Sequence, residues 1–348
     1  MRIAQVAPLF ESVPPQRYGG TERVVSYLTE ELVRRGHDVT LFASGDSRTR
    51  ATLVPVVERP TRLDASSHEL CTADTIRQLD VVAARADDFD VIHWHVDSFA
   101  FPIGRRLRTP SVHTLHGRLD LPHLQSLFRH FHDVPLVSIS DAQRRPLESC
   151  RVRWAATVYH GQPLARYPFR AEHDGYLAFL GRCSPEKQLD VAIEVAKRVG
   201  LPLRIAAKVD HKDRDYFHRV IAPQLDDPLI DFHGEIGEED KAAFLGGALA
   251  LLFPIDWPEP FGLVMVEAMA CGTPVVARPC GAVPEVVVDG RTGFIGSELV
   301  ELVEAVKRID EIDRAECRRH VEERFSVERM TEDYEAVYGR LAARRQAA

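Results

Sequence analysis

The sequence predicts an α/β protein with two doubly wound domains, each built on a parallel sheet. Three observations support this prediction. The chain has 348 residues, which exceeds the roughly 250–300 residues at which a single hydrophobic core stops growing. Strand-like and helix-like segments alternate along the first half of the chain. After a break at residues 161–175, the same alternation starts again.

The first half begins with a strand-like segment, RIAQVAPL. It is followed by an amphipathic helix, TERVVSYLTEELVRRG, which Gly36 can end, and by the strand HDVTLFAS. The later strand-like segments are DVIHWH, PSVHTLHG, PLVSIS and RWAATVYHG, with helices expected near residues 68–87 and 121–132. This is the βαβ pattern of a Rossmann-like domain, which we place at residues 1–162.

The break, GQPLARYPFRAEHDG, contains proline, glycine and mixed charge without clear periodicity, which is typical of a linker. We place the linker at residues 163–174 and a second Rossmann-like domain at residues 175–324. The second domain is expected to alternate the strands YLAFLG, LPLRIAA, LIDFHG, LALLFP and PVVAR with helices, one of them near residues 213–225. Two such sheets facing each other would place the carboxyl ends of their strands on one cleft.

Composition and charge exclude several classes of protein. The net charge of −8 gives no reason to expect nucleic acid as a partner. No stretch is long and apolar enough to cross a bilayer, and the first residues lack the architecture of a signal peptide. The six cysteines are scattered without a CxxC pair, so we expect reduced thiols and a cytoplasmic protein.

The stretch PEPFGLVMVEAMACGTPVV places two carboxylates eight positions apart. Glu259 lies in a Pro-Glu-Pro loop, and Glu267 lies in an apolar helix. Burying an unpaired carboxylate costs several kcal/mol, so Glu267 needs a partner. That partner is either an arginine in an internal salt bridge or a ligand.

Glycine and basic residues follow two of the predicted strands. Tyr18-Gly19-Gly20-Thr21 precedes the first helix, where glycine lets a backbone approach a ligand and free N–H groups favour an anion. The same pattern also occurs in ordinary turns. Arg182 and Lys187 follow the strand YLAFL, where they could meet a diphosphate or form a solvated pair at a helix start.

Histidines also end two strands of the first half. His116 follows SVHTL and could donate a hydrogen bond to a substrate hydroxyl or carbonyl, or could simply be a capping or core histidine. His93 and His95 lie in HWH, where a metal site would need a third ligand that the sequence does not offer. We therefore expect no metal site.

Together these segments resemble the retaining, nucleotide-sugar-dependent glycosyltransferases of family 4, which have the GT-B fold. The resemblance covers nearly the whole chain, and its most specific part is Glu259, seven intervening residues and Glu267. The supporting segments are YGGTERVVSYLTEELVRRGHDVTLF, HTLHG, FLGRCSPEKQLDVAIE, FHGEIGEEDKAAFLGGALALLFP, GAVPEVVVDGRTGFI and FSVERMTEDYEAVY.

The resemblance implies a role for each matching residue. Glu259 would hold the hydroxyls of the donor sugar, and Glu267 would bind the ribose hydroxyls of the nucleotide. Arg182 and Lys187 would stabilise the diphosphate leaving group, and His116 would contact the donor sugar. The other implied donor-binding residues are Gly20 near the diphosphate, Gly234, Glu235 and Ile236 at the base, and Phe261, Gly262, Leu263 and Val264, whose backbone N–H groups would contact phosphate.

The resemblance also implies which substrate each domain binds. The first domain would bind the acceptor, with a C-terminal helix at about residues 325–348 packing back on it, and the second would bind the nucleotide-sugar. The segment AAKVDHKD replaces a glycine-rich turn that is common in the family. We therefore expect Lys208 to add a phosphate contact.

The expected activity is a hexosyl transfer with retention, by front-face displacement, without a metal ion or cofactor. The expected donor is a UDP-sugar, on family frequency, and the acceptor a hydroxyl on a small molecule, a glycan or a lipid-linked molecule. Two alternatives are a nucleotide-sugar epimerase of the same fold and a nucleotide-sugar-binding protein that has lost catalysis.

Overall fold

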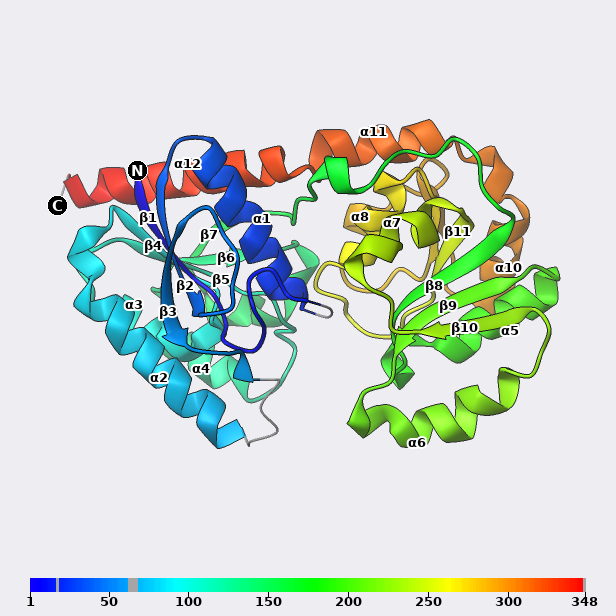
Figure 1. The fold of residues 1–348 in the computed structure, drawn as a ribbon, viewed down its shortest axis with the longest axis horizontal. Helices are drawn as coiled ribbons and strands as arrows, with labels where there is room; N and C mark the ends of the chain where they lie inside the picture. The colour runs from blue at the N-terminus through cyan, green and yellow to red at the C-terminus, as the bar shows by residue number, and fades with distance from the viewer. Residues whose placement is uncertain (17–18, 62–67, 347–348) are drawn as a thin grey trace. The chain divides into compact units, whose positions relative to one another are not determined.

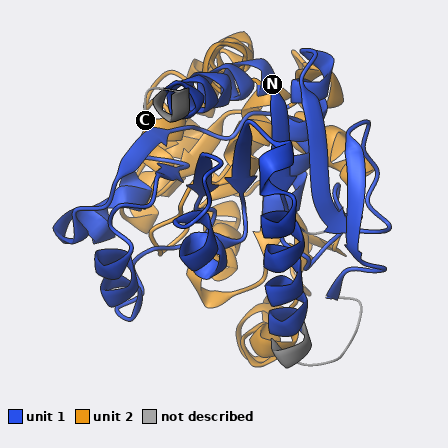
Figure 2. Cartoon of the chain, turned by 90° about the vertical axis from the view of Figure 1, so that its left-hand side faces the viewer, with its two compact units in different colours: residues 1–162, 327–348 blue, residues 163–326 orange. Residues whose placement is uncertain are grey.

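The computed structural model describes residues 1–16, 19–61 and 68–346 (Figure 1). The chain forms two compact units, which Figure 2 distinguishes by colour. Unit 1 contains Met1–Gln162 and Val327–Ala348, and unit 2 contains Pro163–Ser326. Each unit has one sheet, and every strand pair in the described residues is parallel. The predicted α/β fold with two Rossmann-like domains is therefore confirmed.

The sheet of unit 1 has the order β3-β2-β1-β4-β5-β6-β7. Its strands are β1 (Arg2–Val6), β2 (Asp38–Ser44), β3 (Thr52–Val57), β4 (Val91–Trp94), β5 (Ser111–Thr114), β6 (Leu136–Ser138) and β7 (Trp154–Thr157). The α-helices of this unit are α1 (Gly20–Arg34), α2 (His68–Ala84), α3 (Phe101–Gly104), α4 (Leu124–His130) and α12 (Val327–Gln346). The strand order reverses between β1 and β4, which is where open parallel sheets bind ligands.

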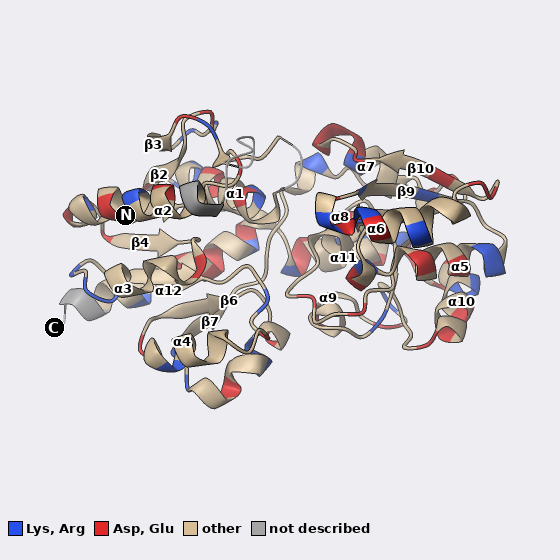
Figure 3. Ribbon diagram, turned by 90° about the horizontal axis from the view of Figure 1, so that it is seen from below, with Lys and Arg blue, Asp and Glu red and all other residues tan. Residues whose placement is uncertain are grey.

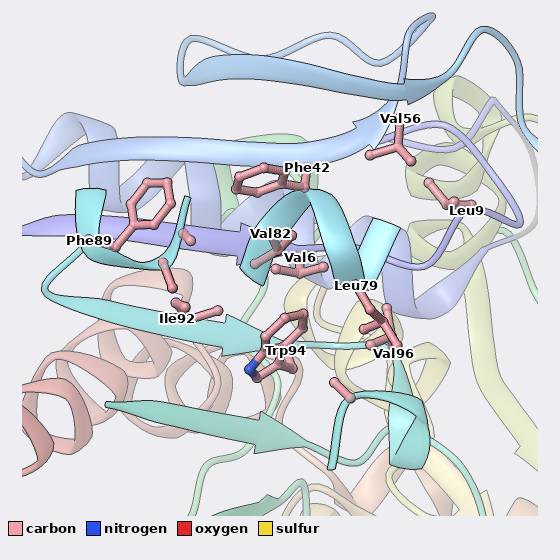
Figure 4. Close-up of a cluster of buried hydrophobic side chains, with 13 residues drawn as sticks. Val6, Leu9, Phe42, Val56, Leu79, Val82, Phe89, Ile92, Trp94 and Val96 are labelled. Atoms are coloured by element: carbon pink, nitrogen blue, oxygen red, sulfur yellow. The ribbon is translucent and has the colours of Figure 1, made fainter. Parts of the chain in front are cut away.

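The two faces of this sheet pack against different helices. One face carries an apolar core that includes Val6, Phe42 and Trp94, with Leu79 and Val82 of α2 packed against them (Figure 4). Side chains alternate along a strand, so Gln5 and His93 point to the opposite face. There they contact Tyr338 of α12.

Strand β3 is not predicted by the sequence pattern. Pro55 lies inside it, and proline weakens a strand prediction because it cannot donate a ladder hydrogen bond. Among the described residues, β3 lies at the edge of the sheet and pairs with β2 alone. An edge strand tolerates proline because one of its sides has no neighbour.

The sheet of unit 2 has the order β10-β9-β8-β11-β12-β13. Its strands are β8 (Tyr176–Arg182), β9 (Leu203–Lys208), β10 (Ile230–Gly234), β11 (Ala248–Phe253), β12 (Val275–Ala277) and β13 (Gly293–Ile295). Its α-helices are α5 (Leu189–Val199), α6 (Arg214–Tyr216), α7 (Glu238–Gly246), α8 (Leu263–Ala270), α9 (Val283–Val286), α10 (Leu299–Lys307) and α11 (Arg314–Arg324). The strand order reverses between β8 and β11.

Two segments of unit 2 differ from their sequence-based description. Residues 163–174, expected as a linker, pack on unit 2: Tyr167 is buried, and the N–H of Arg170 donates to the carbonyl of Cys271 at 3.0 Å. The helix expected near residues 213–225 is irregular. Only Arg214–Tyr216 form the α-helix α6. A π-helical turn at Phe217–Ile221 and a 3₁₀ turn at Ala222–Gln224, which contains Pro223, follow it.

Charged residues of both signs are interspersed along the helices of both units (Figure 3). In the described part of the chain, none of the helices is long and apolar enough to cross a membrane.

Candidate functional site

The predicted site residues of unit 2 lie mainly at the carboxyl ends of its strands. Arg182 is the last residue of β8, and Lys208 is the last residue of β9. Lys187 and Glu259 follow β8 and β11, the two strands at which the strand order reverses. The fold therefore brings the side chains expected to bind phosphate and sugar to the edge where Rossmann-like sheets bind ligands.

Lys187 and Glu259 form an ion pair across this point of reversal. Their side chains are only 16% and 11% exposed. The ammonium of Lys187 also lies 5.4 Å from the ring centre of Phe253 and 4.9 Å from that of Trp257. The aromatic rings and the carboxylate hold the ammonium in place, because each attracts a cation.

Arg182 and Lys208 are linked through a shared carboxylate. Lys208 Nζ lies 2.7 Å from Asp210 Oδ1, and Arg182 Nη1 lies 3.9 Å from Asp210 Oδ2. Arg182 also donates to Glu186 at 2.6 Å. The carbonyl of Glu186 in turn accepts from the N–H of Asp256 at 3.0 Å, which connects this group to the loop that carries Glu259. Three cations thus lie near one sheet edge, each beside a carboxylate.

The position of Glu259 depends on a glycine that follows β12. Gly281 has φ = +58°, and a Cβ there would lie 2.2 Å from the carbonyl oxygen of Glu259 and 2.3 Å from its nitrogen. The next residue, Ala282, donates its N–H to the same carbonyl at 2.9 Å. Only glycine allows this close approach of two backbones, so Gly281 fixes the loop that carries Glu259.

Glu267 has internal partners in this structure. It is 2% exposed on α8, and its Oε1 accepts from Tyr167 Oη at 3.2 Å and from Lys241 Nζ at 3.4 Å. The same two groups contact Glu238. Of the two partners considered from sequence, the internal ion pair is present, although the cation is a lysine of α7 and not an arginine.

The start of α8 contains the residues that the resemblance assigns to phosphate binding. Gly262 precedes the helix with φ = +83°, and a Cβ there would lie 2.6 Å from the terminal methyl of Met265. Phe261 is buried against Phe325 at 5.9 Å between ring centres. Leu263 and Val264 occupy the first turn, whose N–H groups have no acceptor within a helix.

The residues expected at the base lie between β10 and α7. Gly234 ends β10 with φ = +72°, and Glu235 and Ile236 lead to Glu238, the first residue of α7. Glu235 is exposed and Ile236 is half-buried. This turn leads into the helix whose Lys241 contacts Glu267.

The two predicted residues of unit 1 follow β1 and β5. Gly20 begins α1, whereas Tyr18 of the same motif lies outside the described residues. His116 comes two residues after β5, and its Nε2 lies 2.9 Å from Nδ1 of His95. Burial lowers the pKa of His116 to about 3, so its imidazole is neutral at physiological pH.

Several residues of these groups were not predicted from sequence. They are Tyr167, Glu186, Asp210, Lys241, Trp257 and Gly281. Asp210 lies two positions after Lys208, and Gly281 lies in the segment GAVPEVVVDGRTGFI, so both were adjacent to recognised signals. Tyr167 lies in the segment that composition assigned to a linker. Within the described residues, no group of three or more His, Cys, Asp or Glu side chains is arranged to hold a metal ion.

Comparison with known proteins gives consistent matches to both units. Residues 18–170 match the family "Glycosyltransferase Family 4", and residues 166–324 match the family "Glycosyl transferases group 1". Phosphatidyl-myo-inositol mannosyltransferase of Mycobacterium tuberculosis is 29% identical over 323 residues, which cover 85% of this chain and 82% of the relative. Glycogen synthase of the same species is 27% identical over 391 residues, with 96% and 91% covered.

Among solved structures, the chain is similar to AviGT4, a glycosyltransferase involved in avilamycin A biosynthesis. The TM-score is 0.74 at 25% identity, with 99% of this chain and 98% of that chain covered. The similarity therefore extends over the residues of both units. The chain belongs to the GT-B glycosyltransferases, with a family 4 domain followed by a group 1 domain.

Proposed function

We propose that this glycosyltransferase moves a hexosyl group from a nucleotide-diphospho-sugar to an acceptor hydroxyl with retention and without a metal ion or cofactor. The observation that carries the proposal is the gathering of Arg182, Lys187 and Lys208 at one sheet edge of unit 2, beside Glu259. Three cations suit a diphosphate, and a neighbouring carboxylate suits the hydroxyls of the attached sugar. The donor we propose is a UDP-sugar.

In this proposal, Arg182 and Lys187 act as the electrostatic catalyst. Negative charge grows on the diphosphate as the bond from the anomeric carbon to the phosphate oxygen breaks, and fixed cations stabilise that charge. Glu186 and Asp210 hold the guanidinium of Arg182 in place before the donor arrives. Pre-positioned charges need little reorganisation during the reaction, which is why they lower its barrier.

The chemical step is a displacement on one face of the sugar. The acceptor oxygen forms its bond to the anomeric carbon on the face that the diphosphate leaves, and the acceptor proton passes to the departing phosphate oxygen. Glu259 accepts hydrogen bonds from sugar hydroxyls, and His116 contacts the sugar. This sequence of events needs no nucleophilic side chain and no divalent ion.

The nucleotide is bound by the remaining residues of unit 2. Glu267 accepts hydrogen bonds from the ribose hydroxyls, Lys208 adds a phosphate contact, and the N–H groups of Phe261, Gly262, Leu263 and Val264 meet phosphate. The base lies against Gly234, Glu235 and Ile236. We also assign Gly20 of unit 1 to diphosphate binding, and unit 1 to the acceptor site, for a small molecule, a glycan or a lipid-linked hydroxyl. We also propose a cytoplasmic location.

The stereochemistry of the product tests the proposal. Purified protein is incubated with UDP-glucose, UDP-galactose or GDP-mannose and a panel of acceptors, with and without EDTA. Proton NMR of the fresh product reads the anomeric coupling. We expect an α-linked product from an α-linked donor and full activity in EDTA. An inverted product would contradict the front-face step, and an isomerised nucleotide-sugar without transfer would indicate an epimerase.

Two substitutions test the electrostatic roles. Lys187→Ala and Arg182→Ala should each lower turnover on the order of 10²-fold or more while the protein stays folded. Lys307→Ala and Arg308→Ala are matched controls, because both side chains lie in exposed ion pairs of the same unit. A loss of folding in parallel with activity would show instead that the two cations are structural.

A further inference from the structure

A continuous chain of hydrogen bonds runs through the interior of unit 1 and ends at His116. His116 Nε2 lies 2.9 Å from His95 Nδ1, and His95 Nε2 lies 2.8 Å from Gln5 Oε1. Gln5 Nε2 donates to Tyr338 Oη at 3.0 Å, which lies 2.7 Å from His93 Nδ1. His93 Nε2 lies 2.7 Å from Thr114 Oγ1, which lies 2.9 Å from Tyr334 Oη. The chain thus connects β1, β4 and β5 with α12.

The amide of Gln5 sets the direction of these bonds. Its nitrogen donates to Tyr338, so its oxygen faces His95 and must accept a hydrogen bond from His95 Nε2. Burial lowers the pKa of His95 well below its ordinary value, so this imidazole is neutral and carries one proton only. That proton is on Nε2, and Nδ1 of His95 is therefore an acceptor.

The acceptor role of His95 Nδ1 also fixes the last bond, to His116. Since His95 Nδ1 accepts, Nε2 of His116 must carry the proton that it donates. Neutral His116 then has a lone pair on Nδ1. That atom is shielded from solvent and has no hydrogen-bond partner among the described residues. The ring is held against His160, with 5.3 Å between ring centres and 17° between planes.

We propose that Gln5, His95 and Tyr338 are positioning residues that hold His116 as the Nε2-protonated tautomer, so that Nδ1 accepts a hydrogen bond from a hydroxyl of the donor sugar. This proposal rests on the proposed function, which gives His116 its contact with the sugar. It reverses the direction expected from sequence, where His116 was a donor. It also restricts the donor, because the group opposite Nδ1 must carry a proton: a hydroxyl fits, whereas a carboxylate does not.

One alternative has to be distinguished by experiment. If the Gln5 amide were rotated by half a turn, its nitrogen would donate to His95. Every bond between Tyr338 and His116 would then reverse, and His116 Nδ1 would carry the proton. The two arrangements contain the same heavy-atom distances but opposite tautomers, and only the first leaves His116 with an acceptor for the sugar.

Nitrogen-15 NMR of histidine-labelled protein decides between them without any substrate. Protonated and unprotonated imidazole nitrogens have well-separated shifts, and the variant His116→Gln identifies the signals of His116. At neutral pH we expect Nδ1 of His116 to be unprotonated and Nε2 to be protonated. The opposite assignment would overturn the proposal.

Two tyrosines of α12 provide a matched pair of variants, since both are buried and both lose one hydroxyl on mutation to phenylalanine. Tyr338→Phe removes the group that orients Gln5, and we expect a second set of His116 signals from the other tautomer. Tyr334→Phe removes the far end of the chain and should leave the signals of His116 unchanged. Equal effects of the two substitutions would contradict the proposed direction of control.

Binding measurements then connect the tautomer to the sugar. In Gln5→Met and Tyr338→Phe, affinity for UDP-glucose should fall about tenfold, which one hydrogen bond can account for, while affinity for UDP alone stays unchanged. If Nδ1 of His116 were unprotonated but both variants bound UDP-glucose as tightly as the wild type, the proposed hydrogen bond from the sugar to Nδ1 would be contradicted. If the wild-type protein transferred no sugar at all, the proposed function would fail, while the NMR result would still decide the tautomer.

Discussion

His113 is a buried polar residue whose ring nitrogens, within the described part of the chain, have no hydrogen-bond partner. Its ring is stacked near Trp94, with 6.0 Å between ring centres, and meets the edge of Phe101 at 5.0 Å. Burial lowers the pKa of His113 to about 3. The imidazole therefore behaves as a neutral aromatic side chain that has lost its hydrogen bonds to water.

Replacing His113 by leucine should stabilise unit 1 and reduce its sensitivity to acid. In the unfolded chain, His113 takes a proton below about pH 6.5, whereas in the folded chain it remains neutral down to about pH 3. Stability is therefore lost as pH falls through this window, by at most about 1.4 kcal/mol per pH unit for one histidine. We expect His113→Leu to raise the free energy of unfolding by about 1 kcal/mol at neutral pH.

Urea unfolding at about pH 7 and about pH 5 measures both effects. His130→Leu is the control, because it replaces an exposed histidine by the same residue. A steeper loss of stability in acid for His113→Leu than for the wild type would contradict the prediction.

Glu267 and Glu238 are neighbouring carboxylates that allow a controlled test of ribose binding. Both carboxylates contact Tyr167 and Lys241, but only Glu267 is proposed to meet the nucleotide. Glu267→Gln should weaken UDP binding by about 1.5–3 kcal/mol, because hydroxyls bond more strongly to a charged acceptor. Glu238→Gln should change it little. Calorimetric titration with UDP measures both, and equal losses would assign Glu267 a structural role.

At the scale of elements, the loop after β12 packs against the loop after β11 and fixes its position. Gly281→Ala would place a methyl group 2.2 Å from the carbonyl oxygen of Glu259, so the Glu259 loop must move. We expect turnover to fall on the order of 10²-fold, because catalysis is sensitive to displacements of about 1 Å. Gly290→Ala is the matched control: Gly290 also has positive φ, but its Cβ would meet nothing within 4 Å.

Comparison with Gly290→Ala separates the effect of backbone strain from the effect of moving Glu259. Both substitutions force alanine into a conformation that costs about 1–2 kcal/mol, and both should therefore lower the melting temperature. Only Gly281→Ala should lower turnover. If both variants lost activity equally, strain in the backbone, and not displacement of Glu259, would be the cause.

Helix α11 holds several elements of unit 2 together through Arg314. The buried guanidinium donates to the carbonyls of Arg170, Gly246 and Ala248 and to Thr273 Oγ1, at 2.7–3.0 Å. Arg314→Met would remove the donor that these four acceptors share and should destabilise unit 2 by about 3 kcal/mol or more. Arg319→Met, on the exposed side of the same helix, should cost less than about 1 kcal/mol. Chemical unfolding of the two variants measures the difference.

At the scale of the whole molecule, unit 2 is one continuous segment, whereas unit 1 is assembled from both ends of the chain. The return segment α12 buries Met330, Tyr334, Val337 and Tyr338 in unit 1. Without it, Gln5, His93 and Thr114 would each lose a hydrogen-bond partner on α12. Independent folding should therefore differ between the two units.

We expect residues 163–326 to fold alone, to melt cooperatively and to bind UDP. Residues 1–162 should not melt cooperatively, and adding residues 327–348 through a short linker should restore folding. Circular dichroism and heteronuclear NMR of the three fragments check this expectation. A cooperatively folded 1–162 fragment would show that α12 is dispensable for unit 1.

The sequence by itself determined most of the architecture. Alternating strand and helix patterns predict the two parallel sheets, because hydrophobic periodicity reports how each short segment is buried. The stretch from Glu259 to Glu267, with the segments around it, indicated the family that the comparisons confirm. Strand β3 was not predicted, because Pro55 interrupts the strand pattern at the edge of the sheet. The burial of Tyr167 was not predicted either, because its segment has the composition of a linker.

Only the tertiary structure decided which side chains meet. Lys187 and Glu259 are 72 positions apart, and Gln5 and Tyr338 are 333 positions apart. No local pattern contains such pairs, because they depend on strand order and on the return of α12 to unit 1. The partner of Glu267 and the tautomer proposed for His116 both depend on these long-range contacts, because a side chain finds its hydrogen-bond partner only when the fold brings the two groups together.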